Sequence, residues 1–236
     1  MLLKVKQVGI FVGMLILYLI ASGLIENSVI FHGWLRYVLL AVGIVGSIGV
    51  AYFLAKLIKR AEPEFSILPI NFKNWRRFVW LLLIWIGSLF VMGTWKSVGD
   101  KLIGVSIEST STNQELISKT FSYSGFYSVI AMAITLVLVA PIIEELLFRG
   151  LFLAYFDSKK HWWIGVVTSG LLFGLAHIVS SGVRLASLVD WIMYAILGGA
   201  LAFVYKRTRH ISNDILIHMM QNSIATLSLL ITFLQH

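Results

Sequence analysis

The sequence predicts an all-α integral membrane protein: a bundle of about seven to eight transmembrane helices with an intramembrane polar cavity. Composition and segment length both indicate this fold class. Of the 236 residues, 58% are hydrophobic and 13% are charged, whereas a soluble domain averages about 45–50% apolar and about 25% charged residues. The apolar residues gather in long runs, and nothing between the runs is long enough for a separate soluble domain. We therefore expect residues 1–236 to form one polytopic membrane domain.

Seven apolar segments each approach the roughly 20 residues that cross a bilayer. The first is expected to be a retained anchor, because its apolar run exceeds the usual length of about 7–15 residues in a signal peptide. The fourth is too long for one straight span, and Pro141 within it removes a backbone donor, which predicts a kink. The segments cover approximately residues 8–25, 36–56, 78–95, 124–156, 162–181, 185–205 and 211–235.

The distribution of basic residues predicts the orientation of the chain. Most of the 19 Lys and Arg residues flank one side of the segments, so we expect a multi-pass protein of the cell membrane with a cytoplasmic N-terminus. The same residues would contact anionic headgroups of the lipid bilayer. The net charge of +8 does not indicate nucleic-acid binding, because the basic residues stand beside apolar runs. There are no cysteines, which excludes disulfides and thiolate metal sites.

Three charged residues, Glu144, Glu145 and Arg149, lie in the otherwise apolar fourth segment. Charges at membrane depth are costly and are usually functional. Glu145 and Arg149 are four residues apart and so share a helical face, which predicts an ion pair. Glu144 points about 100° away from Glu145 and is expected to face the cavity. The alternative, two solvated glutamates at an interfacial helix end, is disfavoured because the apolar run continues beyond Arg149.

Two further pairs of residues with helical spacing lie in later segments. Phe173 and His177 share one face of the fifth segment, and His218 and Asn222 share one face of the last. Each pair alone is explained by ordinary hydrogen bonds between helices. The lengths of the fourth and fifth segments, however, place Glu144 and His177 at similar depth, about 23 and 27 Å from the connecting turn. These side chains are therefore predicted to converge.

The three motifs together resemble the CAAX-protease and bacteriocin-processing (CPBP, or Abi) family of intramembrane endopeptidases. The family pattern is Glu-Glu-x-x-x-Arg, then Phe-x-x-x-His, then His-x-x-x-Asn on a later helix. The resemblance covers about residues 124–225, whereas the first three segments match only in being apolar. It implies a catalytic core in residues 124–235 that follows the N-terminal spans of residues 1–123. The matching stretches are Glu144-Glu145-Leu-Leu-Phe-Arg149, Phe173-Gly-Leu-Ala-His177 and His218-Met-Met-Gln-Asn222.

This resemblance implies a water-filled cavity open to the cytosol and the bilayer, and a role for each motif residue. Glu144 would be the general base that activates water, with assistance from His177. His218 and Asn222 would bind the oxyanion of the tetrahedral intermediate. General chemistry agrees, because one donor aimed at a developing oxyanion is worth about 10²–10³ in rate. The supporting residues would be Glu145, paired with Arg149, and Phe173.

No cofactor is expected. Glu144, His177 and His218 could form a catalytic zinc site, since two histidines and a glutamate are a known ligand set. The His-Glu-x-x-His helix that is typical of zinc peptidases is absent from the sequence. That absence favours a metal-independent glutamate mechanism. Tightly bound stoichiometric zinc in the purified protein would reject it.

The function predicted from these motifs is hydrolysis of a peptide bond in a membrane-associated peptide or protein. One alternative is a bacteriocin self-immunity protein that acts by binding, or by proteolysis of the toxin or its receptor. Protection that survives substitution of His177 and His218 by Ala would favour binding. A second alternative is a proton-coupled transporter with Glu144 and His177 as a relay. The paired halves common in transporters are not visible in the sequence.

Overall fold

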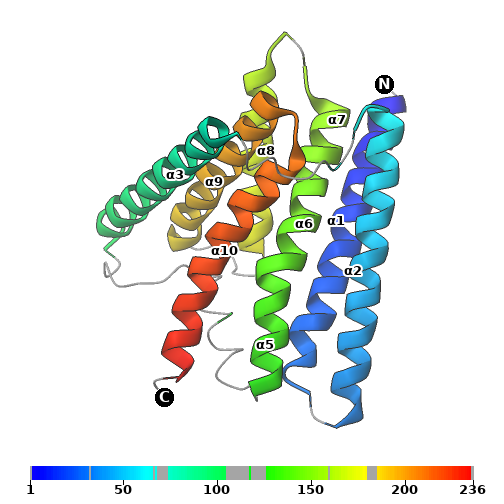
Figure 1. Cartoon of the computed structure of the whole chain (residues 1–236), viewed down its shortest axis with the longest axis vertical. Helices are drawn as coiled ribbons and strands as arrows, with labels where there is room; N and C mark the ends of the chain where they lie inside the picture. The colour runs from blue at the N-terminus through cyan, green and yellow to red at the C-terminus, as the bar shows by residue number, and fades with distance from the viewer. Residues whose placement is uncertain are drawn as a thin grey trace. The chain divides into compact units, whose positions relative to one another are not determined.

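The chain is a multi-pass, all-helical membrane protein. In the computed structural model, the described residues are 2–31, 33–65, 67, 74–104, 117, 126–158, 160–179 and 185–234. Within this part of the chain every regular element is helical, and the described part of each of the seven predicted segments lies on a helix or a continuous run of helical turns (Figure 1). Residues 124–125, 180–181 and 235 of these segments lie outside the described residues. The elements are α1 (Leu2–Ser28), α2 (Trp34–Ala61), α3 (Trp75–Leu102), α5 (Phe126–Ile134), η1 (Thr135–Val139), α6 (Ala140–Glu145), η2 (Leu146–Phe152), α7 (Leu153–Phe156), α8 (Trp162–Ile178), α9 (Leu185–Thr208) and α10 (Ile211–Leu234).

Five helices among the described residues are long and apolar enough to cross a membrane. They are α1, α2, α3, the run Ile130–Phe156 and Ala186–Thr208. Helix α8 is apolar but shorter, with 17 residues, and α10 is not among these five helices. The expected number of seven to eight spans is therefore approximate, whereas the fold class is confirmed.

The chain forms two compact units, each built from segments that are distant in sequence. Unit 1 consists of Met1–Ser66, Ser118–Tyr155 and His218–His236, and unit 2 of Ile67–Ile117 and Phe156–Ile217. Each unit is described separately below. The expectation of one polytopic domain, with N-terminal spans followed by a core, stays a prediction.

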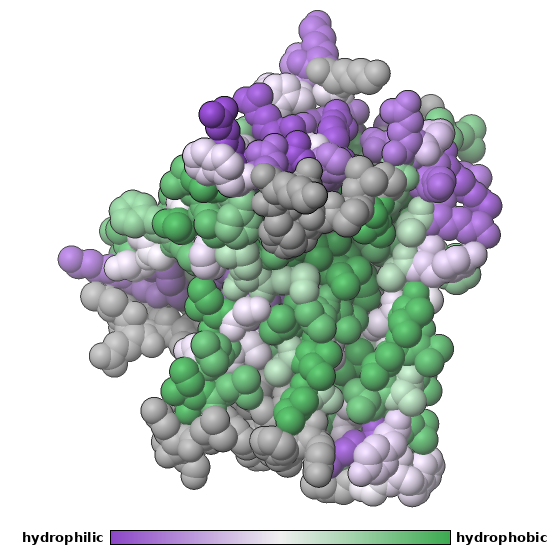
Figure 2. Space-filling view, viewed as in Figure 1, coloured by the Kyte–Doolittle hydropathy of each residue, from purple (hydrophilic) through white to green (hydrophobic). Residues whose placement is uncertain are grey.

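In unit 1, α1 and α2 run side by side (Figure 1). The buried residues of α1 recur at alternating intervals of three and four, from Phe11 through Tyr18 to Ile25, which is the spacing of a packed helix seam. At Gly43 of α2 the helices approach closely, because an added Cβ would lie 3.0 Å from the carbonyl oxygen of Ala21. Small residues permit such contact in membranes. Along these two helices, hydrophobic side chains lie between hydrophilic ends (Figure 2).

In unit 2, glycines bring α8 against α9. A Cβ at Gly170 would lie 2.7 Å from the carbonyl oxygen of Ala195 and 2.8 Å from the nitrogen of Gly199. A Cβ at Gly198 would lie 2.9 Å from that of Phe173. Gly170 and Gly198 thus permit the close packing of α8 against α9. This contact buries Phe173 completely, since its exposed fraction is 0%.

Helix α3 is joined to α9 by buried polar contacts. Lys96 Nζ lies 3.0 Å from Oδ1 of Asp100 and 3.0 Å from Oδ1 of Asp190, and both aspartates are buried. The indole nitrogen of Trp95 donates to the carbonyl oxygen of Val189 at 2.9 Å. Asp190 of α9 is thus paired with Lys96 of α3 inside unit 2.

The close contact at Gly170 predicts a stability change. Gly170→Ala should lower the free energy of unfolding by about 1–3 kcal/mol, because the added methyl group overpacks the α8–α9 contact. Gly87→Ala is the matched control, since a Cβ at Gly87 of α3 meets nothing within 4 Å. Thermal unfolding of both variants in detergent measures the difference. Equal stability of the two variants would contradict this packing argument.

Candidate active site

The two adjacent glutamates lie on a helix with two π-helical stretches. Helix α6, which ends at Glu145, is preceded by η1 and followed by η2, and the helical backbone continues through Pro141. Single π turns within α-helices are frequent at functional sites, because the widened turn redirects the side chains that follow. π-Helical stretches thus lie on both sides of the glutamate pair, and the kink at Pro141 stays a prediction.

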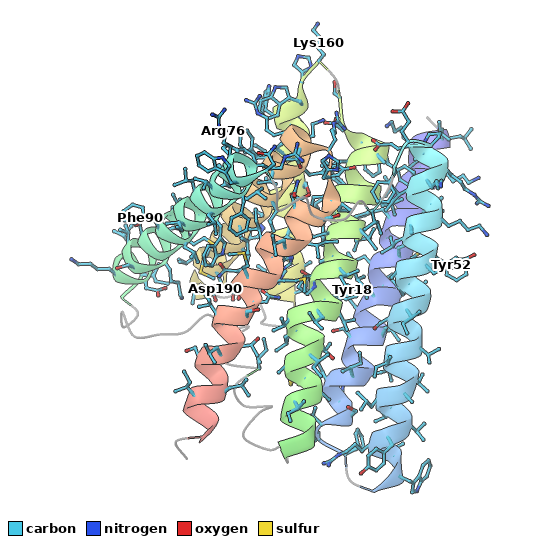
Figure 3. The ribbon with its side chains drawn as sticks, in the orientation of Figure 1. Tyr18, Tyr52, Arg76, Phe90, Lys160 and Asp190 are labelled. Carbon is cyan, nitrogen blue, oxygen red and sulfur yellow. The ribbon has the colours of Figure 1, made fainter. Side chains whose placement is uncertain are left out.

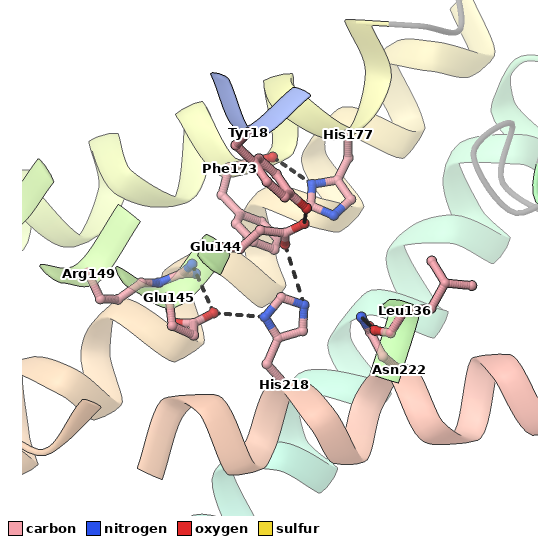
Figure 4. A network of polar contacts seen from close by, with 9 residues as sticks. All are labelled: Tyr18, Leu136, Glu144, Glu145, Arg149, Phe173, His177, His218 and Asn222. Atoms are coloured by element: carbon pink, nitrogen blue, oxygen red, sulfur yellow. Dashed lines mark hydrogen bonds and ion pairs between the residues drawn. The ribbon is translucent and has the colours of Figure 1, made fainter. Parts of the chain in front are cut away.

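Pro141 also changes the hydrogen bonding of η1. The N–H of Ala140 donates to Thr135 O, five residues back. In the same pattern Leu136 O would accept from residue 141, but proline has no N–H. The side chain of Asn222 on α10 supplies the replacement, with its Nδ2 donating to Leu136 O at 2.9 Å (Figure 4). Since an unpaired buried carbonyl is costly, Asn222 compensates for the proline and ties α10 to this helix.

Glu145 and Arg149 form the ion pair expected from their spacing. Arg149 Nη1 lies 3.1 Å from Glu145 Oε1, and both side chains are fully buried. A buried charge pair is costly to assemble, but removing one partner typically destabilises a protein by about 3–5 kcal/mol, because the other charge is left uncompensated. Replacing either residue alone would therefore leave the other charge buried without its partner.

His218 on α10 contacts both carboxylates. Its Nδ1 lies 2.8 Å from Glu145 Oε1, which is a hydrogen-bond distance, and its Nε2 lies 3.7 Å from Glu144 Oε2. Because the exposed fraction of His218 is 1%, the ring is held between the two groups and shielded from solvent. With a carboxylate as acceptor, Nδ1 carries a hydrogen, and Nε2 faces Glu144.

These side chains balance in charge when His218 carries both ring protons. Glu144 and Glu145 are then opposed by Arg149 and the imidazolium. With neutral His218 the same group of residues has a net charge of −1, which is costly at low dielectric.

Tyr18 is a member of this cluster that sequence reasoning missed. Its hydroxyl donates to Glu144 Oε1 at 2.5 Å. Tyr18 points from α1 toward the helix that carries Glu144, whereas Tyr52 on α2 points outward (Figures 3 and 4). The hydroxyl of a buried tyrosine needs a hydrogen-bond partner, so a tyrosine within a membrane span is a sequence signal, although a weak one. Nothing in the sequence indicates which partner it takes.

Phe173 and His177 lie in unit 2 and share a face of α8, as their spacing predicts. Their ring centroids are 4.4 Å apart, and His177 stacks on Tyr194 of α9 at 4.6 Å. His177 Nδ1 lies 2.9 Å from Phe173 O. Because a carbonyl only accepts, Nδ1 is the donor, and Nε2 of the neutral ring is then a base. The convergence of His177 with Glu144 of unit 1, and the predicted polar cavity, stay predictions.

Zinc binding was tested against the described residues. Among them no group of three His, Asp or Glu side chains is arranged to hold a metal ion. Unit 1 supplies Glu144 and His218, one fewer than the three protein ligands of a typical catalytic zinc. The alternative zinc site also requires His177 of unit 2 and stays a prediction, so no catalytic step is derived through a metal.

Comparison with known proteins gives a family match over the same motifs. Residues 126–224 match the family described as type II CAAX prenyl endopeptidase Rce1-like. The match covers 99 of the 236 residues, which is less than half of the chain. This stretch begins at the helix that carries the glutamate pair and ends just beyond Asn222. The resemblance to CPBP proteins expected from the three motifs is thereby confirmed.

Two curated relatives are similar to the chain. "Putative membrane peptidase YdiL" of Bacillus subtilis (strain 168) is 27% identical over 145 residues, which cover 61% of this chain and 53% of the relative. "Uncharacterized 24.3 kDa protein" of Escherichia coli is 30% identical over 109 residues, covering 39% and 49% respectively. The chain thus spans about half of the length of these relatives. No solved structure matches it significantly.

The contact between Asn222 and Leu136 predicts an interaction with Pro141. Asn222→Leu should lower the free energy of unfolding by about 1–3 kcal/mol, because Leu136 O loses its donor. The loss should be smaller in a Pro141→Ala background, where residue 141 regains an N–H. A double-mutant cycle by thermal unfolding in detergent measures this coupling.

Ser223→Ala is the control for that cycle, since the Ser223 hydroxyl bonds only within α10, to Met219 O. It should show no coupling to residue 141. Equal destabilisation by Asn222→Leu in both backgrounds would contradict the explanation through the missing proline donor.

Proposed function

We propose that the protein is an intramembrane endopeptidase that hydrolyses a peptide bond of a membrane-associated peptide or protein. The observation that carries the proposal is a buried carboxylate, Glu144, held by Tyr18 and facing His218 within the family-matched segment. The matched family and the name of the Bacillus relative both describe peptidases, which supports the same reaction class.

Glu144 is the group best suited to act as the general base. It takes a proton from water, and the resulting hydroxide attacks the peptide carbonyl carbon. The proton is then delivered to the leaving amine as the C–N bond breaks, so the carboxylate is regenerated. Proton transfer by a positioned side chain contributes about 10²–10⁴ in rate. Glu145 is less suited to this role, because it is fully buried and its Oε1 contacts both Arg149 and His218.

His218 and Asn222 are proposed to stabilise the oxyanion. Protonated His218 directs Nε2 toward Glu144 and so toward the position where water is activated. Asn222 uses one amide hydrogen on Leu136 O, and an amide group has a second. His177, with Nδ1 on Phe173 O, is proposed to assist Glu144. The reaction is proposed to need no metal, and stoichiometric zinc in the purified protein would contradict this.

The substrate class follows from burial of these groups in membrane-spanning helices. A peptide or protein segment that enters the bilayer reaches them without unfolding the enzyme. The N-terminus is proposed to be cytoplasmic, as the distribution of basic residues indicates. A cysteine introduced at residue 2 should then be labelled by an impermeant thiol reagent only in inverted vesicles. Labelling in intact cells would reverse the orientation.

Substitution of the proposed base provides the functional test. Glu144→Ala should lower cleavage of the natural substrate at least about a hundredfold, because the reaction loses its general base. Comparative membrane proteomics of cells with wild-type and Glu144→Ala protein should show an uncleaved precursor that accumulates only with the variant. That precursor then serves as the substrate in assays of the purified protein.

Glu26→Ala is the matched control, because Glu26 is an exposed carboxylate on α1 that accepts a hydrogen bond from Ser22 of the same helix. This variant should process the precursor at the wild-type rate. Identical proteomes for wild-type and Glu144→Ala cells, at equal protein levels, would rule out the peptidase proposal.

A further inference from the structure

Tyr18 lies far outside the family-matched segment, yet it contacts the proposed base. Its hydroxyl donates to Glu144 Oε1 at 2.5 Å across 126 residues of sequence. The family match begins at residue 126, so the family match assigns no role to α1. The exposed fraction of Tyr18 is 8%, and that of Glu144 is 7%. The contact is thus shielded from solvent, and at this depth lipid offers no competing hydrogen-bond partner.

Packing on both sides fixes the position of Tyr18. Two turns before it, Phe11 lies between Phe148 and Phe152, with ring centroids 5.9 and 5.4 Å apart. Phe11 thereby anchors α1 directly on η2, the turn that follows the glutamate pair. Beyond Tyr18, the close approach of α2 at Gly43 holds the next part of α1. Because Tyr18 has only two rotatable side-chain bonds, its hydroxyl position is determined by these helix contacts.

The two oxygens of Glu144 have different surroundings. Oε1 accepts the hydrogen bond of Tyr18, and Oε2 lies 3.7 Å from His218 Nε2. The 3.7 Å separation is too long for a direct hydrogen bond. A carboxylate held at one oxygen cannot rotate freely about its terminal bond, so Oε2 is kept on the side of His218. This is the oxygen that, in the proposed mechanism, takes the proton from water.

We propose that Tyr18 is a positioning residue for the hydrolytic reaction. By binding Oε1, Tyr18 holds Glu144 in the rotamer in which Oε2 is directed to His218 and to the water that Glu144 is proposed to activate. This inference rests on the proposed function, because it assigns Tyr18 a role through Glu144. It also gives the first helix a part in the reaction, in addition to crossing the membrane. A correctly oriented base contributes to the rate of the chemical step rather than to substrate binding.

The test compares Tyr18→Phe with Tyr37→Phe on the purified full-length protein, using the precursor that accumulates with Glu144→Ala. Tyr18→Phe keeps the packed ring and removes only the hydroxyl, so kcat should fall about ten- to a hundredfold, as for lost hydrogen bonds to charged groups. KM should stay within about twofold. Tyr37 is exposed on α2, and its variant should match the wild type in both constants.

Two further measurements distinguish the positioning role of Tyr18 from a purely structural role. Thermal unfolding of Tyr18→Phe in detergent should show a folded protein. In a Glu144→Gln background, adding Tyr18→Phe should cause no further loss of rate, because the base that Tyr18 positions is already absent. A KM increase with unchanged kcat, or an undiminished loss of rate in that background, would overturn the positioning role.

The outcomes also distinguish this inference from the proposed function. If Glu144→Gln is inactive while Tyr18→Phe keeps the wild-type kcat, the positioning role is overturned and the peptidase assignment holds. If Glu144→Gln cleaves as fast as the wild type, the peptidase mechanism through Glu144 fails, and the role of Tyr18 fails with it. If both variants lose kcat and Tyr37→Phe does not, both proposals are supported.

Discussion

The buried charges of unit 1 are the constraint on which the other features of the site depend. Arg149 and Glu145 are fully buried as a pair, and His218 joins Glu145 to Glu144. Each of these groups would be unfavourable alone at this depth, because lipid provides neither water nor counterions. Together they offset one another, because Arg149 pairs with Glu145 and His218 contacts both carboxylates. The surrounding helices therefore have to bring α6, η2 and α10 together before any of these residues can be accommodated.

The helices around the charges are held by contacts that compensate for special backbone features. Pro141 removes a donor, and Asn222 from α10 restores one to Leu136 O. Gly43 has no side chain, so α1 and α2 can approach closely at this position. Phe11 then aligns α1 with η2, and Tyr18 reaches Glu144. The rigidity of the carboxylate thus follows from helix packing, since side-chain positions in a packed seam leave little freedom.

Much of the candidate site could be predicted because its polar residues depart from the rule that membrane-spanning segments are apolar. Charged and amide side chains are rare in apolar segments, so Glu144, His218 and Asn222 stand out in the sequence, and spacing of four predicts the Glu145–Arg149 pair. The partners of these residues could not be predicted in the same way. Asn222 contacts a backbone carbonyl, which has no sequence signature. The sequence does not indicate which face of α1 is buried, because the lipid-facing and the protein-facing sides of this helix are both apolar.

The sequence by itself determined the all-helical membrane class, the positions of the helices and the local pairs at spacing of four, because hydropathy and helical periodicity are properties of neighbouring residues. Only the tertiary structure decided which oxygen of Glu144 is bound, which carbonyl Asn222 completes, and that Tyr18 from the first helix belongs to the site. The contacts of Asn222 and Tyr18 join residues that are 86 and 126 positions apart. Such distant partners are selected by how the helices pack, and the sequence of either helix alone does not specify the other.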